Sequence, residues 1–183
     1  MAPAPALMTT DEYFRTPETV KPMELIFGVL RVAESPTPRH QSAVLHLLLA
    51  LTAHVRERRL GEMWVAPLDV VLHERKALVV QPDLFFISTD RSHIVSDKVR
   101  GAPDLVIEVL SPNPRIGRTE ERVQWFAEYG VRECWLLDQQ TVSMAVLQFE
   151  SRRVATRTVF DRRSPIVSRV LPEFGSSVSE MLR

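Results

Sequence analysis

The pattern of apolar and polar positions predicts alternating strands and helices along the chain. The clearest strand covers Asp104–Leu110, where three residues are β-branched and a Ser-Pro-Asn-Pro stretch ends the run. Because the residues on both faces of this strand are apolar, we expect it to be a central strand that is covered on both faces. Glu108 interrupts it, and an ionised carboxylate there is costly without a partner, a metal or water. Pairing with a structural arginine and a place at a solvated edge are its two non-catalytic explanations.

Two helices stand out in the pattern. The longer one runs from about residue 39 to 59 and ends at Gly61, with a wide apolar stripe formed by Val44, Leu45, Leu47, Leu48, Leu51 and Val55. The other covers Thr119–Tyr129, with Thr119 as its N-cap. Arg122 shares a stripe of this helix with three aromatic residues, so we expect it to face the core. Its non-catalytic explanation is an arginine lying over aromatic rings.

The remaining elements are short, and most are strands. We expect a capped helix from Thr9 to about Pro17, strands at Met23–Glu34, Met63–Leu72, Ala77–Gln81, Asp83–Ile87 and Val131–Asp138, a polar loop at Ser88–Gly101, a hairpin of Thr141–Glu150 with Arg153–Phe160, and a tail from Ser164 to Arg183. This order predicts one α/β or α+β domain over residues 1–183, with a mixed sheet flanked by helices. Residues 1–8 are expected to form a loose N-terminal segment.

Composition narrows the class of protein. The 183 residues are 45% hydrophobic and 25% charged, which is typical of one globular domain with a sizeable core. Lysine plus arginine equals aspartate plus glutamate, so nucleic acid could be bound only through a local basic cleft. Cys134 is the only cysteine, which excludes a disulfide framework and a cysteine metal cluster. Without an apolar run of about 18 residues or a secretory signal, we expect a soluble cytoplasmic protein that does not contact membranes.

The candidate chemistry rests on carboxylates at strand breaks. The chain has no glycine-rich phosphate loop and no nucleophile elbow. Asp83 follows Pro82 at a break in the strand pairing, and one loop separates its segment from that of Glu108. If the two segments are neighbours, both carboxylates converge, and hard oxygens of this kind suit Mg²⁺. Many α/β proteins carry two acidic residues on adjacent strands, so this spacing alone does not decide the function.

Longer motifs add a resemblance to a known family. They are Met8-Thr9-Thr10-Asp11-Glu12-Tyr13, Glu24-Leu25-Ile26-Phe27-Gly28, Gln81-Pro82-Asp83-Leu84, Ala102-Pro103-Asp104-Leu105-Val106-Ile107-Glu108-Val109-Leu110-Ser111-Pro112 and Tyr129-Gly130-Val131-Arg132-Glu133-Cys134-Trp135-Leu136-Leu137-Asp138. With these motifs the chain resembles the Uma2 family, a bacterial group assigned as endonucleases with the restriction-endonuclease-like PD-(D/E)XK fold. The resemblance spans nearly the whole chain.

The resemblance implies cleavage of DNA phosphodiester bonds that depends on Mg²⁺, with Mn²⁺ as a substitute metal. Asp83 and Glu108 match the family's catalytic, metal-binding carboxylates. Glu24 matches a further acidic residue at the metal, and His40 matches a histidine at the start of the following helix. The fold's usual lysine lies two residues after the glutamate, where this chain has Leu110.

In the family the lysine lies on the next helix instead, at the position matched by Arg122. A guanidinium can neutralise a phosphate or position water, but it does not lose its proton at ordinary pH. Two main hypotheses follow: an active endonuclease, or an impaired nuclease-fold protein that binds nucleic acid or another protein. A small-molecule or structural role is a third. A homodimer is expected from the family and from the apolar strands near the C-terminus.

Overall fold

The computed structural model describes residues 7–17, 21–33, 35–111 and 118–183. Its helices are α1 (Thr10–Phe14), α2 (Pro38–Glu57), α3 (Thr119–Tyr129), α4 (Val178–Met181) and the 3₁₀ helix η1 (Thr89–Ile94). Its strands are β1 (Met23–Ile26), β2 (Val29–Val32), β3 (Gly61–Val65), β4 (Val70–His73), β5 (Leu78–Val80), β6 (Leu84–Ser88), β7 (Val99–Arg100), β8 (Leu105–Val109), β9 (Glu133–Asp138), β10 (Ser143–Glu150) and β11 (Arg153–Phe160). None of the described helices combines the length and the apolar character that crossing a membrane requires.

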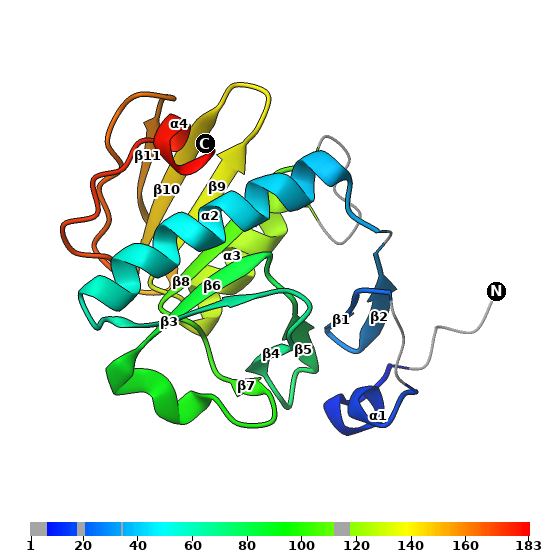
Figure 1. The fold of residues 1–183 in the computed structure, drawn as a ribbon. Helices are drawn as coiled ribbons and strands as arrows, with labels where there is room; N and C mark the ends of the chain where they lie inside the picture. Colours follow the sequence, from blue (N-terminus) through cyan, green and yellow to red (C-terminus); the bar gives the residue numbers. More distant parts are fainter. Residues whose placement is uncertain (1–6, 18–20, 34, 112–117) are drawn as a thin grey trace.

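Within the described residues the strands form two mixed sheets (Figure 1). The larger sheet has the order β11-β10-β9-β8-β6-β3, and the smaller one has the order β2-β1-β5-β4-β7. β8 pairs antiparallel with β6 and parallel with β9, so the predicted central strand is confirmed. The parallel pair is joined through α3, because parallel neighbours need a crossover connection. The predicted class, a mixed sheet flanked by helices, is therefore confirmed, although the strands divide between two sheets.

The two long helices cover opposite faces of the larger sheet (Figure 1). Leu105 and Ile107 pack in one buried cluster with α2, whereas Val106 packs in another with α3. Successive side chains of a strand point to opposite faces. Glu108 has the parity of Val106 and therefore points to the α3 side of the sheet.

The structure corrects two predictions in the middle of the chain. The segment Met63–Leu72 is not one strand, because β3 belongs to the larger sheet and β4 to the smaller one, with Ala66-Pro67 between them. A proline lacks the N–H that a continuous ladder needs, so the chain changes sheets there. The predicted loop Ser88–Gly101 also contains structure, since η1 and β7 lie within it.

Three details of the helices also differ from prediction. α2 ends at Glu57, and Gly61 begins β3 instead of closing the helix. Leu45 was placed in the apolar stripe but is 52% exposed. Thr119 is the first residue of α3, with Arg118 in the N-cap position.

Other predictions at the chain ends are confirmed. Thr9 and Glu12 form the capping box of α1, and β10 pairs with β11 as the predicted hairpin. Of the segment expected to be loose, residues 1–6 lie outside the described residues. Met8 is held in place, because its N–H donates a hydrogen bond to the carbonyl oxygen of Gly28 at 2.8 Å.

Candidate active site

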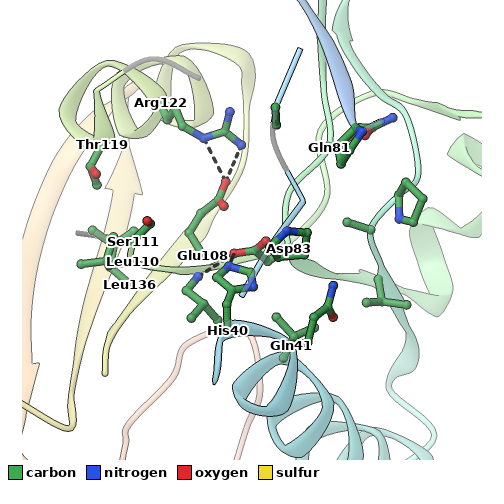
Figure 2. A pocket seen from close by; sticks show the side chains of 18 of the residues that line it. His40, Gln41, Gln81, Asp83, Glu108, Leu110, Ser111, Thr119, Arg122 and Leu136 are labelled. Atoms are coloured by element: carbon green, nitrogen blue, oxygen red, sulfur yellow. Dashed lines mark hydrogen bonds and ion pairs between the residues drawn. The ribbon is translucent and has the colours of Figure 1, made fainter. Parts of the chain in front are cut away.

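A pocket of about 360 Å³ lies where the N-terminal ends of α2 and α3 meet the C-terminal end of β8. Figure 2 shows side chains from distant parts of the sequence pointing into it. All five residues predicted for the site line this pocket: Glu24 of β1, His40 of α2, Asp83 just before β6, Glu108 of β8 and Arg122 of α3. The structure therefore brings the predicted set together in one place.

Asp83 lies beside Glu108 because of the strand register. Leu84 of β6 pairs with Ile107 of β8, and one position further along this antiparallel ladder Asp83 comes alongside Glu108. The predicted neighbourhood of the two segments is thus confirmed. Asp83 Oδ2 accepts hydrogen bonds from the Val109 N–H at 2.8 Å and from His40 Nε2 at 3.2 Å. The break after Pro82 turns the carboxylate out of the ladder and into the pocket.

Arg122 joins two carboxylates that come from different sheets. Its Nε and Nη2 donate to Glu108 Oε1 at 3.1 and 2.6 Å, and its Nη1 donates to Glu24 Oε2 at 2.6 Å. The side chains are 12% (Arg122), 15% (Glu108) and 3% (Glu24) exposed, so the three charges are largely removed from water. Such a triad is held together only because each charge has a close partner.

Burial changes the acidity of this group. Loss of solvent raises the pKa of Glu108 from 4.5 to about 7, with the nearby Asp83 adding to the rise and Arg122 opposing it. Burial lowers the pKa of Arg122, but the attraction of Glu108 and Glu24 outweighs it and raises that pKa above its ordinary value. Near neutral pH, Glu108 therefore exchanges a proton while Arg122 stays charged.

The non-catalytic explanations given for Glu108 and Arg122 also describe real contacts. Glu108 does pair with an arginine, and the Arg122 guanidinium lies 5.6 Å from the centre of the Phe126 ring. These contacts fix where the two side chains point. They leave Glu108 Oε2 without a hydrogen bond from any described residue, and this oxygen is available for another ligand.

The His40 side chain contacts the Asp83 carboxylate in the pocket. The hydrogen bond to Asp83 raises the pKa of the imidazole, although burial opposes the rise. Its other nitrogen, Nδ1, is buried and has no hydrogen-bond partner among the described residues. The histidine and the Val109 N–H therefore hold the same oxygen of Asp83, and they leave Oδ1 free of bonds from described residues.

Gln81 is a pocket residue that the sequence analysis missed. Its backbone N–H donates to Glu24 Oε1 at 2.7 Å, and its amide Nε2 donates to Asp69 Oδ1 at 2.9 Å. Asp69 is fixed in turn by Lys98 and Tyr13. The signal available in the sequence was a polar residue directly before Pro-Asp, at the end of an otherwise apolar strand.

The donor atoms of this pocket fit a hard divalent cation. Glu24 and Glu108 contact the Arg122 guanidinium, Asp83 lines the same pocket, and Asp83 and Glu108 each keep one oxygen free of bonds from described residues. Among the residues that the structure describes, no group of three His, Cys, Asp or Glu side chains could enclose an ion. Mg²⁺ needs only one or two carboxylates, because waters fill its other positions. Both oxygens of Glu24 accept hydrogen bonds, so its role as a ligand stays a prediction.

Comparisons with known proteins agree with this architecture. The crystal structure of "a putative nuclease belonging to DUF820" from Anabaena variabilis matches with a TM-score of 0.79 and 20% sequence identity, over 96% of this chain and 97% of that chain. At this identity the likeness shows the fold alone. No curated protein matches the chain.

The described elements, two mixed sheets flanked by helices, are consistent with a restriction-endonuclease-like fold. The family described as "Putative restriction endonuclease", Uma2, matches residues 10–179. The chain belongs to the Uma2 family, as its motifs predicted, and this supports a nuclease function at the level of the family.

Proposed function

We propose that the protein is a metal-dependent endonuclease that hydrolyses phosphodiester bonds of DNA, with Mg²⁺ as its metal and Mn²⁺ as a substitute. The observation that carries this proposal is the convergence of Asp83 and Glu108, each with a free oxygen, beside the guanidinium of Arg122. Carboxylates that can hold a metal ion, beside a cationic side chain, suit metal-assisted phosphoryl transfer, because the metal and the cation stabilise the charge on the phosphate.

Asp83 and Glu108 would hold the metal. When bound there, the ion supplies charge for the phosphate and lowers the pKa of a water molecule. The chain's own contribution is orientation: the Val109 N–H and His40 fix Asp83, and Arg122 fixes Glu108. Because the Arg122 guanidinium stays protonated, its part is to attract the phosphate and not to accept a proton.

The test is cleavage of linear and supercoiled DNA with Mg²⁺, with Mn²⁺ and with a chelator. We expect the wild type to cut only with a divalent ion, and Asp83→Asn and Glu108→Gln to lose about 100-fold or more of the rate. Glu62→Gln is the matched control, because Glu62 is an exposed carboxylate on β3. Equal cleavage by wild type and Glu108→Gln would refute the assignment.

A second candidate is a nuclease-fold protein that grips nucleic acid without cutting it. The observation in its favour is that the Arg122 guanidinium donates to both Glu24 and Glu108, so carboxylates already occupy its charge. Arg122→Lys separates the two candidates. A silent wild type that gains cleavage as Arg122→Lys supports the binding module, and cleavage by the wild type supports the enzyme.

A further inference from the structure

β11 forms an open edge of the larger sheet and carries an unusual set of charges. It pairs with β10 on one side and is the last strand in the sheet order. Seven of its eight residues are exposed, from Arg153 to Val159. The strand and its two flanking turns contain five exposed arginines, which we call the basic edge: Arg152, Arg153, Arg157, Arg162 and Arg163.

The basic edge carries a net positive charge, and the rest of the chain carries an equal net negative charge. Residues 152–163 hold five arginines and one acidic residue, Asp161, which gives four net positive charges. The chain as a whole is neutral, so the other residues hold 18 basic and 22 acidic side chains and four net negative charges. The charge is therefore unevenly distributed along the chain, and the basic edge is a local concentration of positive charge.

These charges do not take part in the internal structure. Within the described residues, none of the five arginines forms an ion pair. Asp161 instead accepts hydrogen bonds from the backbone N–H groups of Arg163 and Ser164, both at 2.8 Å, and attracts Arg163 only at longer range. By contrast, the nearby Arg169 is paired with Glu150. The basic edge is thus available to an external partner.

One end of the basic edge lies at the same end of the larger sheet as the pocket. Phe160 pairs with Met144 and Ser143 pairs with Asp138, so the end of β11 lies at the same end of the sheet as Gln139, which lines the pocket. Figure 1 shows the chain after β11 at that end. Three strand spacings separate β11 from β8, or about 14 Å. Arg157 is opposite Leu147, whose side chain belongs to the α3 cluster, so it shares the face to which Glu108 points.

A second copy of the chain fits this edge poorly. Antiparallel pairing of β11 with itself would bring Arg153 and Arg157 of both copies into one ladder, and like charges there repel. Charged side chains on an edge strand prevent such pairing. A polyanion fits better, because it offers repeated negative charges and needs no strand of its own.

We propose that the basic edge binds the phosphate backbone of duplex DNA along β11, with Arg162 and Arg163 at the end of the sheet that contains the pocket. This assignment rests on the proposed function for the choice of DNA as the polyanion. The contacts carry no sequence information, because phosphates are common to every sequence. They supply affinity that falls steeply with salt concentration.

The experiment measures binding to a fluorescent DNA duplex of about 30 base pairs. A chelator removes divalent ions from the buffer, so that cleavage does not interfere. Arg153→Gln, Arg157→Gln and Arg162→Gln are combined in one variant. Each lost phosphate contact lowers the slope of log affinity against log salt by about 0.9, so the slope should fall by about 2.7. Between 50 and 200 mM salt the wild type should then lose about 40-fold more affinity than the variant.

Two controls make the result specific. Arg15→Gln, Arg56→Gln and Arg75→Gln combined remove the same charge from exposed positions elsewhere, and this variant should keep the wild-type slope. A variant that combines Arg153→Lys, Arg157→Lys and Arg162→Lys should also keep the wild-type slope, because the positive charges are retained. Circular dichroism confirms that each variant is folded.

The outcomes separate this proposal from the nuclease proposal. If the wild type cuts DNA but the glutamine variant keeps the wild-type salt slope, the basic-edge proposal is overturned and the nuclease proposal stands. A reduced slope without cleavage under any metal supports the basic edge and removes the nuclease. If the wild type does not bind DNA, or if the variant instead loses an acidic protein partner or self-associates through β11, the assignment is overturned.

Discussion

Replacing Glu108 by glutamine removes the carboxyl group whose pKa burial raises from 4.5 to about 7. Between these two pH values the folded wild type retains the proton that the unfolded chain has lost. Raising the pH therefore favours the unfolded chain, and stability that is fully present below about pH 4.5 is lost as the pH rises through about 7. At about 1.4 kcal/mol per pH unit, the loss amounts to about 3 kcal/mol.

Glu108→Gln should not show this loss. Chemical denaturation of both proteins between pH 4.5 and 8 gives two curves of unfolding free energy against pH. We expect their difference to change by about 3 kcal/mol across this range, in favour of the variant as the pH rises. The pKa of His40 is raised chiefly by its hydrogen bond to Asp83, which both proteins contain, and to a smaller extent by Glu108. Parallel curves would refute the conclusion that Glu108 is a desolvated acid.

Three further predictions follow from the same contacts. Binding of Mg²⁺ at pH 6.5 should release protons from the wild type and fewer from Glu108→Gln, because the ion requires the ionised carboxylate; calorimetry in buffers of different ionisation enthalpy measures this. Arg122→Met should lower the unfolding free energy at pH 8 by about 3 to 5 kcal/mol, since it leaves Glu24 and Glu108 buried without their partner; a loss below about 1 kcal/mol would contradict the triad. Gly61→Ala should lower the melting temperature, because a Cβ there would lie 2.1 Å from the Ile87 carbonyl oxygen, whereas Gly175→Ala, with no neighbour within 4 Å, should leave it unchanged.

Local patterns predicted the parts of the fold that depend on local chemistry. The β-branched run of β8, the aromatic stripe of α3 and the Thr9 capping box each contain their own signal within a few residues. The convergence of Asp83 and Glu108 was predicted on the condition that their segments are neighbours, and the antiparallel pairing of β6 with β8 meets this condition.

The features that escaped prediction depend on long-range packing. The run Met63–Leu72 contains Pro67, which marks a break, but the pattern does not show that the segments on its two sides join different sheets. Leu45 has the spacing of a core residue, but among the described residues it stays 52% exposed. Glu24 and Arg122 are 98 positions apart, and no spacing rule connects a strand-end glutamate to a helix so distant in sequence.

Because the pocket takes residues from both sheets, the site can form only when both sheets are folded and packed together. Glu24 comes from the smaller sheet and Glu108 from the larger one, and the Asp83 break is one of the points where the chain passes between them. A folding intermediate with only one sheet formed would contain acidic residues but no pocket. A chain in which one of the two sheets had not formed would lack the site, and under the proposed function it would not cut DNA.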